Sequence, residues 1–512
     1  MSPLGLDIGT TNCKGTVFSA DERCLARTSR ELAILHPHPG CVELDSKAIV
    51  EAILEIIREL ALSARESRDP VRALSISALE EAMTPVSCDR QILGNAIHHS
   101  DTRGRAEIGA FMAAISREAL YAINPNIVWT AYSLVKLLWL KADEPELYSR
   151  TDKFLFFGEL TLFLLGCEAA TSFSQPNRTL LVDLRKEAWS DALLGIAGIE
   201  ASRIPRLVPS GHIAGTVPAA KAATLGIDRD VICVVGGHDQ CCNALGVGIC
   251  LAGTVVDGSA TGECSTPVYA GILDSNLMLE AKLNVEHHVV PGLYVSFIYN
   301  QAGSVVKWFR NTLARNEQVA ATQDLYERLT AETPNTPSPL LVLPHFEPTG
   351  DPSFIEDSSG IILGLRTSTE RGEILKAIME GETFYFLQCL ESLALLGVDM
   401  SRFFASGGGA KSSAWLQIKA DIMGIPFDRA ADREAGVLGV AMIAGKAVGE
   451  FATYEEVCAC FVRAGRVFEH DLSRHAIYRE QFERYRQLYP RLVDVPKMNN
   501  RSSTAIQMSY LT

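Results

Sequence analysis

The sequence predicts an α/β protein built from two domains. Its 512 residues are too many for one hydrophobic core, so at least two domains are expected. Short apolar runs typical of strands alternate with segments of helical spacing along most of the chain. A strand, a Gly/Thr-rich turn and a second strand at residues 4–18 are followed by a similar pattern at 253–263, which indicates a weak internal repeat.

The first of these patterns predicts a β-hairpin that carries a carboxylate. An apolar strand ends in Asp7, a turn with Thr10 and Thr11 follows, and a second strand covers residues 16–18. Backbone N–H groups and hydroxyls in such a turn can bind phosphate oxygens, and a strand-end carboxylate beside them can hold Mg²⁺ through water. An ordinary hairpin with a hydrophilic turn is the alternative, because the string is short.

An amphipathic helix and another strand come next. Apolar positions at helical spacing predict a helix over 46–67, and the run at 73–77 predicts a strand that leads into Glu80 and Glu81. A strongly apolar helix is predicted over 132–140, and its simplest interpretation is core packing.

The polar loop at 98–103 contains Asp101 and Arg103. Acid and Arg side chains at strand ends suit a polyhydroxylated ligand, because its buried hydroxyls need both donors and acceptors. A surface ion pair between Asp101 and Arg103 explains the same two residues equally well.

The middle of the chain contains the residue on which the functional prediction depends. An apolar strand over 231–235 is expected to turn on Gly236 and Gly237 and to continue into a helix of small residues that starts near Asp239. Backbone N–H groups and the helix dipole would keep a carboxylate at that position ionised. The alternative is that Asp239 is only an N-cap.

The second half repeats these features. The hairpin at 253–263 is followed by a long helix over 370–396 and by a strand that ends in three glycines within 406–412. Glycines between a strand and a helix allow a ligand to approach the backbone and leave a helix N-terminus facing it. A tight turn without a ligand remains possible there. The small-residue helix at 434–441 is expected to serve close packing.

Composition excludes several classes of function. A net charge of −14 without a basic stripe makes a nucleic acid or an anionic membrane an unlikely partner. We expect no signal peptide, because MSPLGLDIG (1–9) lacks a basic segment followed by an apolar one. We also expect no membrane span, because no apolar run reaches about 18 residues. The 13 scattered cysteines favour reduced thiols and a cytoplasmic protein, and neither they nor the 11 histidines have the spacing of a zinc site.

With these segments in order, the chain resembles the FGGY carbohydrate kinases of the actin-like ATPase superfamily. The resemblance runs from Leu4 to about Gly449 and depends on eight short motifs in the family's order. They are DIGTTNCKG (7–15), HPHPGCVELD (36–45), SDTRG (100–104), SLVKLLWL (133–140), GGHDQCCNALGVG (236–248), SATGE (259–263), SGGGAKSSAWLQIKAD (406–421) and EAGVLGVA (434–441).

The resemblance implies two actin-like (ribonuclease H-like) domains with ATP and a sugar in the cleft between them. It makes Asp239 the general base for the attacking hydroxyl and Asp7 the residue that positions Mg²⁺. The positions that it assigns to the nucleotide are Thr10, Thr11, Lys14, Thr261, Gly262, Gly408, Gly409, Ser412 and Gln417. The best matches for substrate contacts, besides Asp239, are Glu81, Asp101 and Arg103.

We therefore expect an ATP- and Mg²⁺-dependent kinase acting on a pentulose, a hexulose or a sugar alcohol. The expected domains are residues 1–245 on the sugar side and 246–490 on the nucleotide side, with a loosely held tail at 491–512. A homodimer is possible. Residues 78–83, ALEEAM, differ from the Gln-Met-His-Gly-like loop of xylulose and ribulose kinases, so the sequence does not identify the sugar. The rival functions are a non-catalytic sugar or nucleotide sensor and an actin- or chaperone-like ATPase.

Overall fold

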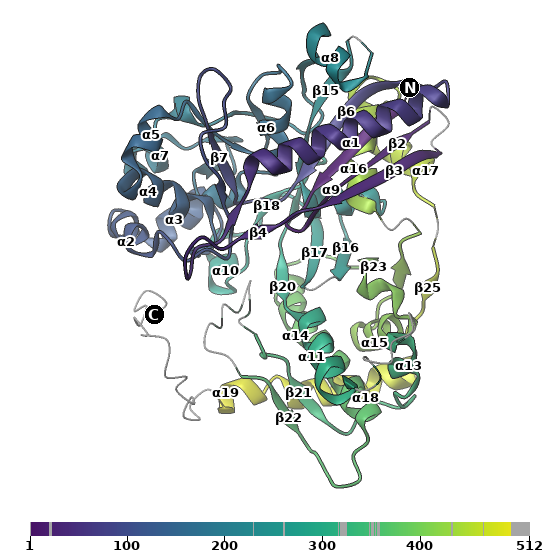
Figure 1. Cartoon of the computed structure of the whole chain (residues 1–512). Coiled ribbons are helices and arrows are strands. Elements are labelled where there is room, and N and C mark those ends of the chain that lie inside the picture. The colour runs from purple at the N-terminus through teal and green to yellow at the C-terminus, as the bar shows by residue number, and fades with distance from the viewer. Residues whose placement is uncertain are drawn as a thin grey trace.

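Two β-sheets, one from each half of the chain, form the centres of two lobes (Figure 1). The computed structural model describes residues 2–19, 23–228, 230–259, 262–315, 317, 325–347, 349, 353, 355, 359–431, 434–463 and 465–492. Both sheets are flanked by helices, as expected for an α/β protein. Thr261 and the predicted tail beyond residue 492 lie outside the described residues.

The first sheet has six strands in the order β14-β15-β6-β1-β2-β3. Strands β15, β6 and β1 are parallel, whereas β1, β2 and β3 form antiparallel pairs in which Asp7 lies opposite Lys14. The strands are β1 (Ser2–Ile8), β2 (Asn12–Phe18), β3 (Cys24–Glu31), β6 (Val71–Ala78), β14 (Ile213–Thr216) and β15 (Ile232–His238).

Helices cover both faces of the first sheet. On one face, the apolar side of α1 (Ser46–Glu66) packs on β2 and β3, and the N-cap residue Asp45 accepts from the backbone N–H groups of Lys47 and Ala48. On the other face, α16 (Ala435–Ala447) packs on β1 and β6. The yellow-green α16 therefore lies among the purple N-terminal strands (Figure 1), although it belongs to the second half of the sequence.

The remaining elements of the first half form a helical region beside this sheet, apart from α8 and α9, which pack with the sheet itself. The helices are α2 (Arg105–Ala113), α3 (Arg117–Ile123), α4 (Ser133–Asp143), α5 (Pro145–Arg150), α6 (Phe157–Leu164), α7 (Asp191–Ala197), α8 (Ala219–Leu225), α9 (Asp239–Gly246) and the 3₁₀ turns Asn177–Thr179 and Ala201–Arg203. The short strands are β4 (Ile34–Leu35), β5 (Glu43–Leu44), β7 (Met83–Val86), β8 (Ala96–Ile97), β9 (Lys153–Phe156), β10 (Ala170–Ser172), β11 (Val182–Asp183), β12 (Ala188–Trp189) and β13 (Arg206–Val208).

The second sheet repeats the core of the first. Strand β16 pairs antiparallel with β17 and parallel with β23, just as β1 pairs with β2 and β6, so the predicted internal repeat is confirmed. Its strands are β16 (Thr254–Ser259), β17 (Glu263–Ala270), β18 (Glu286–His287), β19 (Leu293–Val295), β20 (Ile298–Asn300), β23 (Arg402–Gly407), β24 (Phe427–Arg429) and β25 (Val467–Phe468).

The helices of the second half surround this sheet, except for α16 and its neighbour α17, which join the upper lobe (Figure 1). The elements not yet given are α10 (Ser275–Glu280), α11 (Ala302–Leu313), α13 (Leu325–Ala331), β21 (Leu341–Leu343), β22 (Ile361–Leu363), α14 (Arg371–Leu395), the 3₁₀ turn Gly409–Lys411, α15 (Ser413–Met423), α17 (Tyr454–Phe461), α18 (Leu472–Tyr485) and α19 (Leu488–Leu492).

Helices α9 and α16 cross where the two halves of the chain meet. They approach so closely that a Cβ at Gly439 would overlap the carbonyl oxygen of Cys242, and one at Gly246 would overlap that of Ala435. The small residues predicted at 434–441 therefore serve close packing, as expected. Buried apolar side chains of both halves form one continuous cluster around this crossing.

Most predicted elements are present, and one local prediction is wrong. Gly236 and Gly237 do not form a turn, because β15 continues to His238 with an irregular register between Val235 and Gly237. Glycine is required there by neighbours rather than by a turn, since a Cβ at Gly236 would overlap the carbonyl oxygen of Ile76. Among the described residues, no helix is both long and apolar enough to cross a membrane.

Candidate active site

Asp7 lies at the end of β1, where the first hairpin begins. Ser77 Oγ, on the adjacent parallel strand β6, donates a hydrogen bond of 2.8 Å to Asp7 Oδ1. Burial and the nearby negative charge of Asp239 raise the pKa of Asp7 to about 6. A carboxylate in such an excess of negative charge suits a divalent cation, so Asp7 fits the predicted Mg²⁺ position.

The turn of the first hairpin connects this carboxylate to the second half of the chain. Lys14 Nζ lies 2.8 Å from Glu434 Oε2, and Glu434 is the N-cap residue of α16. Thr10 is half-buried in the turn and Thr11 is exposed. The hydroxyls and the ammonium group are thus near solvent, where a phosphate could reach them.

Asp239 is the first residue of α9 and directly follows β15. The N-cap position belongs to His238, so the alternative that Asp239 is only an N-cap is wrong. The side chain of Asp239 is 28% exposed, whereas that of the neighbouring Glu80 is 1% exposed. Asp239 is therefore a carboxylate that a ligand can reach, at the N-terminal end of α9.

Behind Asp239 lies a buried cluster of three glutamates around one arginine. Arg178 Nη1 is 2.7 Å from Glu81 Oε1, and its Nε lies 3.1 Å from Glu286 Oε1 and 3.3 Å from Glu80 Oε2. The guanidinium also lies over the ring of Phe297, 4.9 Å from its centroid. Nε and Nη1 of Arg178 are thus used by carboxylates of the protein itself.

The backbone at this cluster is strained. Glu81 has a φ of 65°, in the left-handed region that non-glycine residues rarely adopt. Ser133 Oγ donates to its carbonyl oxygen at 2.8 Å, and the ion pair with Arg178 holds its side chain. Strain of this kind is held by surrounding contacts and is common at ligand sites.

The charges of the cluster are strongly perturbed. Burial, and then the charge of Glu286, raise the pKa of Glu80 well above its ordinary value, and burial also raises the pKa of Glu286. Glu80, His238 and Glu286 could together surround a metal ion, since their ligand atoms lie within 4.8 Å of one another. The guanidinium of Arg178 already supplies the cation for two of these three groups, so the arrangement is better suited to a fixed ion pair than to a metal.

Asp101 and Arg103 are bound to each other. Asp101 Oδ1 and Oδ2 are both 3.0 Å from Arg103 Nε, and Arg103 Nη2 also lies 2.9 Å from Glu43 Oε1. Burial raises the pKa of Asp101, but bonds from Arg103 and from the backbone N–H of Val42 outweigh it and hold the pKa below its ordinary range. The ion-pair alternative is therefore present in the structure, although the pair is largely buried rather than on the surface.

A buried lysine pairs with carboxylates on both strands of the second hairpin. Lys419 Nζ lies 2.5 Å from Asp257 Oδ2 and 2.9 Å from Glu263 Oε1, at the two strand ends that flank the turn. Burial and the charge of Asp257 raise the pKa of Glu263 to about 8. Gly262, in the described part of the turn, lies against the ring of Tyr299.

The glycine-rich segment lies beside this hairpin. A Cβ at Gly409 would come within 2.5 Å of Ser259 Cβ, whereas a Cβ at Gly408 would meet only Ser259 O, at 3.9 Å. Gly408 therefore presents open backbone to its surroundings, as expected where a ligand approaches.

Helix α9 links the two groups of residues. Asn243 Nδ2 donates to Ser406 Oγ at 3.0 Å, and a Cβ at Gly258 would lie 3.5 Å from Gln240 Oε1. The helix that begins with Asp239 thus contacts the ends of β16 and β23. Residues of both halves meet here, as two-substrate transfer chemistry requires.

Comparisons with known proteins give the family. The model for the N-terminal domain of the FGGY family of carbohydrate kinases matches residues 3–246, and the model for the C-terminal domain of that family matches residues 275–448. The chain belongs to the FGGY family of carbohydrate kinases. It is thus a carbohydrate kinase with the two-domain actin-like fold.

Known relatives span almost the whole length of this kinase. It is 27% identical to the xylulose kinase of Bacillus subtilis over 497 residues, which are 96% of this chain and 97% of that protein. The crystal structure of xylulose kinase from Rhodospirillum rubrum superimposes with a TM-score of 0.87 at 26% identity and covers 96% of this chain and 99% of that chain. Gluconate kinase from Lactobacillus acidophilus also gives 0.87, at 22% identity, covering 96% and 98% of the two chains, and this likeness shows the fold alone.

Two residues that the kinase resemblance assigned to the nucleotide have structural partners. Ser412 is the N-cap of α15, and its Oγ accepts from the N–H of Trp415 at 3.2 Å. Gln417 donates its amide to Asp421 Oδ1 and to the carbonyl oxygen of Glu469. These bonds explain both side chains without a ligand, so their nucleotide role stays a prediction.

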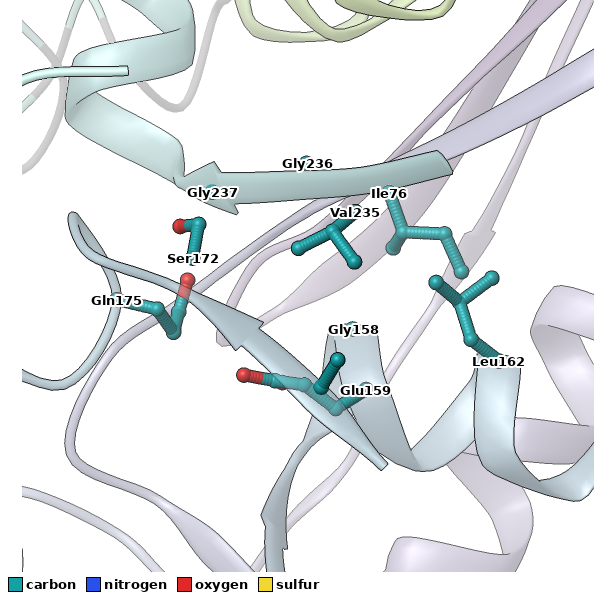
Figure 2. Close-up of a pocket in the computed structure, with 10 residues that line it drawn as sticks. Ile76, Gly158, Glu159, Leu162, Ser172, Gln175, Val235, Gly236 and Gly237 are labelled. Atoms are coloured by element: carbon teal, nitrogen blue, oxygen red, sulfur yellow. The ribbon is translucent and has the colours of Figure 1, made fainter. Parts of the chain in front are cut away.

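A small cavity lies behind the end of β15 (Figure 2). Its volume is about 10 Å³, and Glu159, Ser172 and Gln175 line it beneath Gly236 and Gly237. Burial raises the pKa of Glu159 to about 7. The cavity has room for about one water molecule and cannot hold a sugar.

Sequence reasoning missed several residues around Asp239. Arg178, His238 and Glu286 complete the cluster, and His99 is close enough for Glu81 and Asp239 to affect its pKa, which burial lowers. The only signal in the sequence was the polar content of the segments GGHDQ (236–240) and NRT (177–179). Nothing in the sequence indicates that positions 178 and 286 lie close together. The adjacent Glu80 and Glu81 were visible, but Glu80 could not be identified as buried.

Proposed function

We propose that this kinase transfers the γ-phosphate of ATP to a hydroxyl of a small sugar or polyol, with Asp239 as the general base. Family membership supports the reaction class. The observation that carries the base assignment is the reachable carboxylate of Asp239 at the start of α9, on the helix that contacts β16 and β23 of the second lobe.

The residues divide into two sets with different tasks. Thr10, Thr11 and Lys14 on the first hairpin, together with Gly262, Gly408 and Gly409 in the second lobe, would bind the phosphates and the nucleotide; Thr261, in the same turn as Gly262, is proposed from the sequence alone. Asp7 would hold Mg²⁺, which neutralises phosphate charge when bound. The pair Ser412 and Gln417 is retained as a weaker nucleotide prediction.

The substrate set surrounds Asp239. Glu81 is the substrate contact that the geometry supports best, because Arg178 holds its side chain and both Glu81 and Asp239 lie close enough to His99 to affect its pKa. Asp101 and Arg103 would act on the substrate mainly by shaping the site, since their charged atoms are bound to each other. His99 lies close enough to Glu81 and Asp239 for both charges to raise its pKa, against the larger lowering effect of burial.

In the proposed step, Asp239 accepts the proton of the attacking hydroxyl as the O–P bond forms, and ADP carries the electron pair of the broken bond. A positioned base contributes roughly 10²–10⁴-fold to the rate. The loose transition state of phosphoryl transfer leaves positioning and charge neutralisation as the main tasks of the protein.

The test is ADP formation by the purified kinase with Mg²⁺ and ATP against a panel of ketoses, aldoses and polyols. We expect a sugar-dependent rate that Asp239→Asn lowers by roughly 10²–10⁴-fold without loss of ATP binding. The matched control is Asp191→Asn, because Asp191 is also an exposed first residue of a helix, α7, in another part of the lobe. Full turnover in Asp239→Asn would refute the base assignment, and ATP hydrolysis without sugar dependence would favour an ATPase.

A further inference from the structure

His238 is a buried histidine in contact with the proposed base. Its Nε2 lies 3.1 Å from Asp239 Oδ1 and 3.4 Å from Glu80 Oε2. The ring packs edge-on against Phe297, with centroids 5.0 Å apart. The histidine is therefore fixed by Phe297 on one side and by the glutamate cluster on another, and its reach to Asp239 does not depend on a flexible side chain.

The hydrogen-bonding pattern defines which nitrogen carries the proton. Nδ1 of His238 is buried and has no hydrogen-bond partner within the described part of the chain. A proton on Nδ1 would be a buried donor without an acceptor, which costs about 1–3 kcal/mol. The neutral ring with its proton on Nε2 avoids that cost, and Nε2 is the ring nitrogen that lies 3.1 Å from Asp239 Oδ1 and 3.4 Å from Glu80 Oε2.

Asp239 is the better acceptor of that proton. Glu80 Oε2 already lies 3.3 Å from Arg178 Nε, and it is farther from His238 than Asp239 Oδ1 is. Among the described residues, no other side chain forms an ion pair or a hydrogen bond with Asp239. Without His238, the carboxylate at the exposed first turn of α9 would sample several χ1 and χ2 rotamers.

We propose that His238 is a positioning residue that holds the Asp239 carboxylate through Nε2–H in the orientation from which it accepts the hydroxyl proton. The inference depends on the proposed function, because it assumes that Asp239 is the base. Asp239 Oδ1 is bound to His238, and this leaves Oδ2 free to face the substrate hydroxyl. Small misplacements of a reacting group are enough to cost about 10²-fold in rate.

The experiment uses two substitutions that differ only in where they place an amide N–H. His238→Gln puts its amide nitrogen near the position of Nε2, whereas His238→Asn puts it near Nδ1 and cannot reach Asp239. We expect His238→Asn to lower kcat by roughly 10- to 100-fold with little change in KM for ATP. His238→Gln should retain most of the wild-type kcat, and equal losses in the two variants would overturn the inference.

A double-substitution test separates positioning from a general structural role. If His238 acts through Asp239, then His238→Asn should cause no further loss of the residual rate in an Asp239→Asn background. A loss of the same size in both backgrounds would contradict the proposal. If Asp239→Asn itself kept full activity, the proposed function would fail instead, so the two failures are distinguishable.

A spectroscopic measurement covers the case in which His238→Asn does not fold. In the wild-type kinase labelled with ¹⁵N-histidine, the His238 signals, assigned by their absence in His238→Gln, should be those of a neutral ring protonated at Nε2. A ring protonated at Nδ1 would refute the proposed hydrogen bond whatever the kinetics of the variants.

Discussion

The carboxylates of Asp7 and Asp239 lie close enough to repel each other, and together with burial this repulsion raises the pKa of Asp7 to about 6. One residue ends β1 and the other begins α9, so parallel strands at the centre of the first sheet bring the two charges together. This repulsion destabilises the ligand-free protein, and a cation bound at Asp7 would reduce the repulsion.

The first prediction concerns stability and pH. A carboxyl whose pKa is raised by folding destabilises the protein above that pKa, where it must be ionised, and not below its ordinary pKa of 3.8. Asp7→Asn should therefore raise the free energy of unfolding of the ligand-free kinase at pH 8 by an amount on the order of 1–2 kcal/mol, seen as a higher melting temperature, and by clearly less at pH 5. Mg²⁺-dependent turnover should be lost in the same variant.

Thermal denaturation without nucleotide or Mg²⁺, at the two pH values, makes this comparison. Asp45→Asn is the control, because Asp45 is the N-cap of α1 and Asn caps a helix equally well. A melting temperature of Asp7→Asn that is unchanged at pH 8 would show that the repulsion has little effect on stability.

The second prediction concerns the buried cluster. Arg178→Met leaves Glu81, Glu286 and Glu80 without their shared cation, which should destabilise the kinase by about 3–5 kcal/mol in urea titrations at pH 8. Glu80→Gln should have a smaller effect, because burial raises the pKa of Glu80 well above its ordinary value and so disfavours its charged form. Equal losses in the two variants would contradict this charge assignment.

The third prediction concerns the charge of the substrate. Arg178 Nε and Nη1 are paired with glutamates, and Asp239 and Glu81 add negative charge, so the carboxylate of a sugar acid would meet an excess of negative charge in this site. Gluconate should show a kcat/KM at least about 10²-fold below that of glucitol, because like charges cost several kcal/mol. The pair has the same carbon number and nearly the same hydroxyls, and equal rates on both would refute the argument.

The fourth prediction concerns the crossing of α9 and α16. Gly439→Ala introduces a methyl group that overlaps the backbone of Cys242, and we expect a loss of about 1–3 kcal/mol or more in stability. Gly109→Ala in α2 is the matched control, because it is also a mid-helix glycine but has no atom within 4 Å of an added Cβ. That substitution should be neutral or stabilise by up to about 1 kcal/mol, and similar behaviour of both would show that the crossing tolerates expansion.

Much of the fold could be predicted from local patterns. The spacing of apolar residues along the sequence identified the hairpins and helix α1. The small residues at 434–441 identified α16 as a close-packed helix. Asp7 and Asp239 could be selected because each follows a strand at a hairpin or helix start. The error at Gly236 and Gly237 arose because local sequence cannot show that Ile76 of the neighbouring strand excludes a side chain there.

The buried cluster could not be predicted for a different reason. Arg178 lies on a 3₁₀ turn, Glu80 follows β6 and Glu286 is on β18, so only the tertiary structure brings them together. Ser412 is the opposite kind of case, because the sequence assigned it a ligand role and the structure gives it a structural one. A hydroxyl beside a glycine-rich segment is as typical of a helix cap as of a ligand contact.

The position of α16 has a consequence for how the polypeptide is made. The face of the first sheet that α16 covers, with the buried side chains of Phe18, Ala73 and Val234, is complete in the nascent chain once α9 has left the ribosome, yet α16 itself follows about 200 residues later. At a synthesis rate of about 5–20 residues per second, that apolar face stays uncovered for roughly 10–40 s before α16 is made. During translation the first lobe is therefore an unfinished core, and a chain released before residue 435 would need a chaperone to stay out of aggregates.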